Sequence, residues 1–164
     1  MIEFLSAASR LVATAGAAWI IGSTCFSLCC ARMDPQRAAL RAALPLLIAA
    51  GLVVLGHAGL MWTQALTLAP FGSGSTDWES LINGTHVGRV WRIRASVAVL
   101  LLVLTLVATA RRGPRSRWAC ATMAATYLAL GPWGGHAAGA ASAWQVMLPN
   151  VIHVLAISVW VGAL

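Results

Sequence analysis

The feature that most constrains the fold of this chain is a series of apolar blocks, each about as long as a membrane-spanning helix, separated by short polar connections. A lipid environment offers no water to pair backbone groups, so helices or closed barrels are required there. No block alternates apolar and polar residues with the period of a barrel strand. With 60% apolar and 9% charged residues, the composition also lies outside the soluble globular range. We therefore expect an all-α fold, a polytopic transmembrane helix bundle forming a single domain over residues 1–164.

The apolar blocks predict about five spans. Asp34 is a candidate N-cap for the second helix, and Pro35 suits its first turn. The last block is still apolar at Leu164, so we expect a chain that is short or truncated at its C-terminus. The predicted helices cover residues 11–31, 35–69, 90–110, 117–131 and 149–164.

Arginines predict the orientation of the bundle. The net charge of +7 would suggest nucleic acid for a soluble protein, but seven of the arginines fall in two connections, between the first and second helices and between the third and fourth. This distribution follows the positive-inside rule, so both connections are expected in the cytoplasm and the N-terminus outside, with no nucleic-acid partner. The seven are Arg32, Arg37, Arg41, Arg111, Arg112, Arg115 and Arg117.

Histidines are expected to gather near the outer surface. The helical rise of about 1.5 Å per residue puts His57 about 22 Å beyond Ala42, in the outer third of a hydrocarbon layer about 30 Å thick. His86 precedes the third predicted helix, His136 follows the fourth, and His153 lies in the first turn of the fifth. Because all four lie toward one side, a shared outer site is a reasonable hypothesis.

The residue types at this outer end favour copper. Met61 follows His57 by four residues and shares its helix face. Imidazole with thioether suits copper, whereas hard cations require carboxylates, and none of the carboxylates lies inside a predicted span. No catalytic triad, phosphate-binding glycine loop or zinc spacing is present, so an enzyme is not expected. The candidate metal ligands are His57, Met61, His86, His136 and His153.

Three further features accompany these ligands. Arg92 and Arg94 point to different helix faces, so one of them is expected to face the bundle and to pair with Asp77, Glu79 or a carbonyl. The stretch GPWGGHAAG interrupts the fourth helix and is a candidate mouth for a site. Four cysteines lie toward the inner side, either as an inner Cu(I) site or as small apolar residues packing between helices: Cys25, Cys29, Cys30 and Cys120.

Three stretches follow one another along the second half of the chain: THVGRVWRIR at 85–94, GGHAAG at 134–139 and IHVLAISVWVGAL at 152–164. Together they resemble the CopD family of bacterial copper-resistance membrane proteins. The matching positions are Thr85, Gly88, Trp91, Arg94, His136, His153, Trp160 and Gly162. The resemblance implies a protein of the bacterial inner membrane, linked to copper uptake and working with a periplasmic CopC-like copper carrier.

The resulting hypothesis is a multi-pass, copper-binding protein of copper import and resistance that receives copper, of either oxidation state, on the periplasmic side. Two alternatives remain open. In one, two of the histidines are axial ligands of haem b in an electron-transfer subunit. In the other, the chain is a membrane scaffold that docks a periplasmic copper protein without transporting metal.

Overall fold

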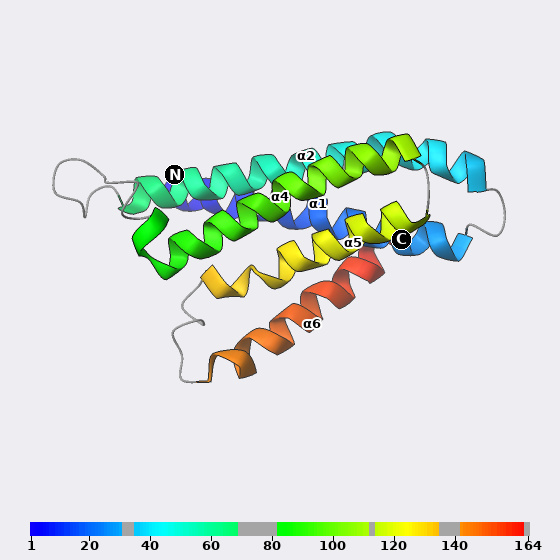
Figure 1. Cartoon of the computed structure of the whole chain (residues 1–164). Coiled ribbons are helices and arrows are strands. Elements are labelled where there is room, and N and C mark those ends of the chain that lie inside the picture. Colours follow the sequence, from blue (N-terminus) through cyan, green and yellow to red (C-terminus); the bar gives the residue numbers. More distant parts are fainter. Residues whose placement is uncertain (31–34, 69–81, 112–113, 135–141, 163–164) are drawn as a thin grey trace.

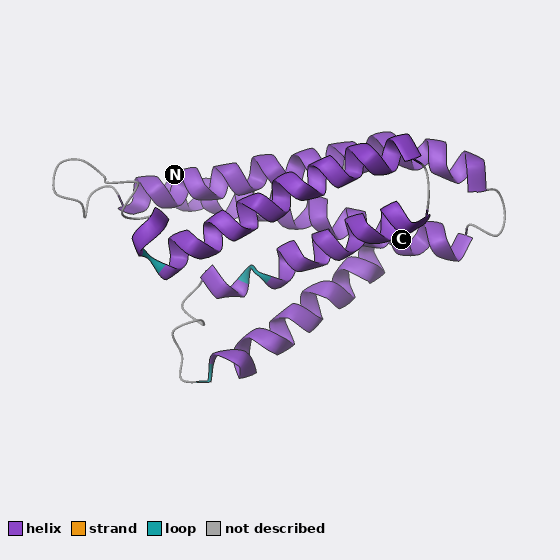
Figure 2. Cartoon of the chain, viewed as in Figure 1, coloured by secondary structure: helices purple, strands orange, loops and turns teal. Residues whose placement is uncertain are grey.

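The computed structural model describes residues 1–30, 35–68, 82–111, 114–134 and 142–162. These residues form long helices joined without any strand among them, which confirms the all-α prediction (Figures 1 and 2). The helices are α1 (Ile2–Cys30), α2 (Pro35–Leu68), α4 (His86–Arg111), α5 (Pro114–Ala129), the 3₁₀ turn η2 (Pro132–Gly134) and α6 (Ala143–Gly162).

Within the described residues, four helices are long and apolar enough to cross a membrane. The candidate spans are Ile2–Ser27, Ala43–Thr67, His86–Ala110 and Ala143–Val161. The fourth predicted span, 117–131, corresponds to α5, which has 16 residues and is shorter than the roughly 20 residues that a full crossing requires. Nevertheless α5 packs against α1 and α4 within the bundle, and its Tyr127 is fully buried.

Several helices begin earlier than the sequence predicted. The first begins at Ile2 instead of Leu11, so Arg10 lies well inside α1. The last begins at Ala143, and Pro149, which we had expected at its start, lies inside α6. His86 is the first residue of α4 because Thr85 caps the helix, its Oγ1 accepting a hydrogen bond from the Gly88 backbone N–H at 2.9 Å.

Small residues bring α1 and α2 into close contact. A Cβ atom on Gly16 would lie 2.5 Å from the Ala49 carbonyl oxygen, and one on Gly56 would lie 2.6 Å from the Ala13 nitrogen. Helices in membranes associate through such small residues, since lipid tails provide no hydrophobic drive. The buried core continues into α4 and α5 through larger side chains, among them Ile20, Val53, Leu101 and Tyr127.

The last helix packs less completely than the others. In Figure 1 α6 approaches the bundle toward its C-terminal end and diverges from it at its start. Only 11% of its span window is buried. Many of its large apolar side chains, including Trp144, Ile152 and Trp160, are exposed, as they are on the lipid-facing surface of a membrane helix.

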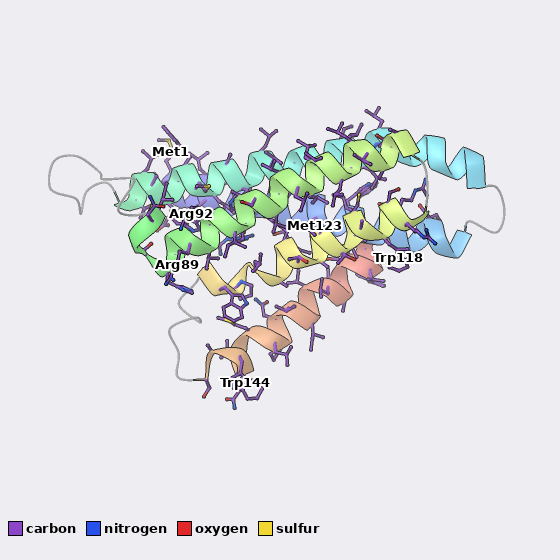
Figure 3. The ribbon with its side chains drawn as sticks, in the orientation of Figure 1. Met1, Arg89, Arg92, Trp118, Met123 and Trp144 are labelled. Atoms are coloured by element: carbon purple, nitrogen blue, oxygen red, sulfur yellow. The ribbon has the colours of Figure 1, made fainter. Side chains whose placement is uncertain are left out.

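The two arginine-bearing connections join helix ends at the same end of the bundle. Helix α1 ends and α2 begins there, as α4 ends and α5 begins (Figure 1). In Figure 3, Trp118 of α5 lies toward this end, whereas Arg89 and Arg92 lie at the opposite end, where α4 begins. The helix arrangement is thus compatible with both connections lying on one side of a membrane.

Candidate functional site

A cavity of about 360 Å³ opens between the helices at the end opposite the arginine-bearing connections. It is lined by residues from α1, α2, α4, α5, η2 and α6, so nearly every element contributes to its wall. Its volume lies within the range of small-ligand sites. The polar side chains that line it are Arg10, Thr14, His57, Gln64, Arg94 and Asn150.

His57 is buried in the wall of this cavity, with only 4% of its surface exposed. Its Nε2 lies 3.2 Å from the Trp91 carbonyl oxygen, and its Nδ1 lies 3.3 Å from the Tyr127 hydroxyl. Because a carbonyl can only accept, Nε2–H donates to Trp91, and in the neutral ring the lone pair of Nδ1 receives the Tyr127 O–H. The buried imidazole is therefore satisfied by groups from α4 and α5.

Tyr127 also joins the histidine to an arginine. Its ring meets the His57 ring edge-on, with centroids 5.7 Å apart. The Arg94 guanidinium carbon lies 4.5 Å from the centre of the Tyr127 ring, which is cation–π geometry. The three side chains form a continuous arrangement at the cavity, which we call the His57–Tyr127–Arg94 cluster.

On α4, Arg94 faces the bundle, whereas Arg92 is exposed. This confirms that one of them turns inward. Among the described residues, the Arg94 guanidinium contacts the Tyr127 ring. The Nε atom of Arg94 is buried without a hydrogen-bond partner. The predicted partners Asp77 and Glu79 lie outside the described residues.

The structure brings two of the five candidate ligands to the cavity, His57 and Met61. His86 is exposed at the start of α4, and its Nε2 lies 3.2 Å from the Trp133 carbonyl oxygen. His153 lies in the middle of α6 and not in its first turn, because the helix begins at Ala143; it is exposed and does not line the cavity, although Asn150 and Val154 do. His136 lies outside the described residues, and within the described ranges no three His, Cys, Asp or Glu side chains form a metal-ligand cluster.

The interruption after α5 does border the cavity, as predicted. Gly131, Pro132 and Gly134 line it. The Gly131 N–H donates to the Leu128 carbonyl and the Gly134 N–H to the Gly131 carbonyl, so the chain tightens into η2 there. The broken helix therefore supplies one wall of the site.

Other lining residues were not anticipated from the sequence. Tyr127 is the one tyrosine of the chain, and a phenol inside an apolar helix normally has a buried hydrogen-bond partner, which was an available signal. Arg10 directly precedes residue 11, where the first helix is predicted to begin. Gln64 and Asn150 are polar residues within long helices, and their common cavity depends on how those helices are rotated.

Toward the end of the bundle that carries the arginine-bearing connections, Cys25 and Cys120 are free thiols. Cys120 is buried, with the Thr105 hydroxyl 3.7 Å from its Sγ. Cys25 and Met123 both pack against the hydrophobic core. The side chains of Cys29 and Cys30 lie outside the part of the chain whose side chains are described.

Comparison with known families gives one match. The model for the copper resistance protein D-like N-terminal domain matches residues 1–146. The match includes the first two helices and the stretches at 85–94 and 134–139, whereas the third stretch, at 152–164, lies outside it. No curated protein and no solved structure matches the chain.

Proposed function

The chain belongs to the copper resistance protein D-like family, and from this premise we propose that it binds copper in the bacterial inner membrane and receives it from the periplasmic side. Copper is the cargo in this proposal, and its passage requires ligand exchange without covalent catalysis. The proposal rests on one observation, that His57 and Met61 line the same cavity.

The hydrogen bonds of His57 suit a metal ligand. Histidines that bind metals usually donate their other N–H to a carbonyl or carboxylate, which orients the ring. The Trp91 carbonyl accepts the Nε2–H in this way, so Nδ1 carries the lone pair. Copper would take the place of the Tyr127 hydroxyl at Nδ1, and the Met61 thioether would favour Cu(I).

The remaining candidate ligands would act on the approach to this cavity. His86 is exposed at the start of α4, which suits contact with an incoming ion or a carrier, whereas His153 lies in the middle of the α6 span. With His136 they could pass copper inward from a periplasmic CopC-like protein. This extension of the proposal depends on sidedness, for which the two arginine-bearing connections are the support.

The direct test is the copper content and affinity of the purified full-length chain. We expect His57→Ala to lower copper affinity by about 100-fold or more, since loss of even an outer partner of a ligand costs about 10–100-fold. Met61→Leu should weaken Cu(I) binding more than Cu(II) binding. Met147→Leu is the matched control, because Met147 is buried on α6 without lining the cavity.

Unchanged copper binding in His57→Ala would refute the assignment of the site. The two alternative functions give different results in the same preparation. A Soret band without copper would indicate the haem electron-transfer subunit. Absence of any metal, with binding of a periplasmic copper carrier retained in the histidine variants, would indicate the scaffold.

A further inference from the structure

The cavity contains positive charge that no described carboxylate neutralises. Arg10 from α1 and Arg94 from α4 both line it. The one carboxylate among the described residues, Glu3, lines an adjoining groove and forms no ion pair in the described part of the chain. Two guanidinium groups therefore share the wall of one cavity without a counter-ion from the described residues.

The Nε donor of Arg94 has no hydrogen-bond partner among the described residues. One face of its guanidinium lies over the Tyr127 ring, which compensates charge but accepts no conventional hydrogen bond. Its Nε is buried and without a partner, and a buried donor left unpaired is costly. Because guanidinium donors form a planar fork, the missing partner is best supplied by a carboxylate or phosphate group.

Arg10 lies at the boundary of the cavity. Together with Thr14, Gln64 and Trp91 it lines both the cavity and the adjoining groove between α1, α2 and α4. The Arg10 side chain is exposed, whereas Arg94 is partly buried. Both carry positive charge, so an anion in this cavity would be attracted by both groups.

We propose that this cavity binds an oxyanion, a carboxylate or a phosphate group, between Arg10 and Arg94. Gln64 and Asn150 line the same cavity and supply amide donors of the kind that complete an anion's hydrogen bonds. This anion site does not require copper, although His57 lines the same cavity. The cavity volume of about 360 Å³ accommodates a small oxyanion or the head group of a lipid.

The anionic group that binds between the two arginines could belong to a free anion or to a lipid. A free anion would enter from the aqueous side. An anionic lipid would place its phosphate in the cavity and its acyl chains along the adjoining groove, whose lining includes the apolar Ile2, Leu11 and Val87. Both sources require the same two arginines, so one set of variants serves for both.

The test uses the full-length chain, freed of metal by chelation, in nanodiscs of zwitterionic phosphatidylcholine. Inorganic phosphate or acetate is titrated against chloride at equal ionic strength, and the thermal unfolding midpoint is followed, because a ligand of the folded state raises it by mass action. A second set of nanodiscs contains phosphatidylglycerol. We expect phosphate or acetate to raise the midpoint in a saturable manner.

Arg10→Gln and Arg94→Gln should each raise the anion concentration needed for half of the stabilisation by about tenfold or more, as expected for loss of a charge-assisted hydrogen bond. Arg92→Gln is the matched control, since Arg92 lies on the same helix and is exposed. If Arg94→Gln does not fold, because its contact with Tyr127 is lost, Arg10→Gln still tests the site from an exposed position.

Loss of the phosphate effect in phosphatidylglycerol nanodiscs, with the midpoint already raised, would support the site and identify a lipid head group as the source. Persistence of the effect there would support the site and identify a free anion. The proposal is overturned if neither free anions nor phosphatidylglycerol stabilises the protein. It is also overturned if Arg10→Gln and Arg94→Gln respond like the wild type, or if Arg92→Gln loses the effect equally. Copper is absent throughout, so these results are independent of whether His57 binds copper.

Discussion

Tyr127 connects two groups that are costly to bury in a membrane bundle, an imidazole and a guanidinium. Its hydroxyl reaches His57 Nδ1, and its ring face receives Arg94. Polar side chains within spans usually face the bundle interior and find partners there. A single phenol serves both partners because its edge and its face present different chemistry.

Tyr127→Phe separates these two contributions. The ring remains for Arg94, while the hydrogen bond to His57 is lost, so we expect the free energy of unfolding to fall by about 1 kcal/mol. Copper affinity should stay the same or rise, because the Nδ1 lone pair no longer has a competing donor. Unfolding by denaturing detergent and copper titration measure the two effects.

Tyr127→Leu is the companion variant, which also removes the ring and should cost more, since Tyr127 is fully buried. Equal destabilisation by Phe and Leu would mean that the ring contact with Arg94 contributes nothing. A loss of copper affinity in Tyr127→Phe would argue against ligand exchange at Nδ1.

Among the elements, the pairing of α1 with α2 depends most on residue size. Gly16, Gly56 and Gly59 of these helices each face the partner helix so closely that a Cβ atom would clash, at Gly59 with the Ser9 hydroxyl. Gly51, also on α2, has nothing within 4 Å of its Cβ position. The same residue type therefore has different roles within one helix.

Gly56→Ala and Gly51→Ala form a matched pair. At Gly56 the new methyl group would lie 2.7 Å from the Ser9 carbonyl oxygen, so α1 and α2 must separate, and we expect a loss of about 1–3 kcal/mol in the free energy of unfolding. At Gly51 alanine should stabilise the helix by up to about 1 kcal/mol. Detergent unfolding monitored by circular dichroism would distinguish them, and similar effects at both positions would contradict the close packing.

For the whole molecule, the important relation is between the arginines and the cavity. The helix ends that flank the arginine-bearing connections lie at one end of the bundle, and the cavity lies at the other. If those connections are cytoplasmic, the cavity opens toward the periplasm. The direction from which copper or an anion enters follows from this sidedness.

Cysteine labelling tests the sidedness. In a variant whose native cysteines are replaced by serine, Asn83→Cys and Ser142→Cys should react with a membrane-impermeant maleimide in intact spheroplasts. Trp118→Cys, exposed at the start of α5, should react only after permeabilisation. The reverse pattern would place the cavity on the cytoplasmic side and exclude copper reception from the periplasm.

Much of the architecture could be inferred from the order of residues alone. The all-α bundle follows from apolar blocks long enough to cross a bilayer. The arginines of the two connections predict that both lie at the same end of the bundle. Sequence spacing was enough to place His57 and Met61 on one helix face. The proline and glycines of the sequence were enough to indicate the helix interruption at Gly131 and Pro132, which line the cavity. Helix starts were less predictable: α1 begins at Ile2, so that Arg10, an exposed residue that borders the cavity, lies within the helix and not before it.

The partners of the buried polar groups could not be inferred in this way. Tyr127 meets His57 and Arg94 only because three helices are rotated toward one another, and apolar residues around each helix leave that rotation undetermined by pattern. His86 and His153 share a predicted side of the membrane with His57, yet they lie outside the cavity wall. Residue order therefore specifies helices and their depth, whereas contacts between distant side chains depend on helix packing, which is the sum of many small steric fits.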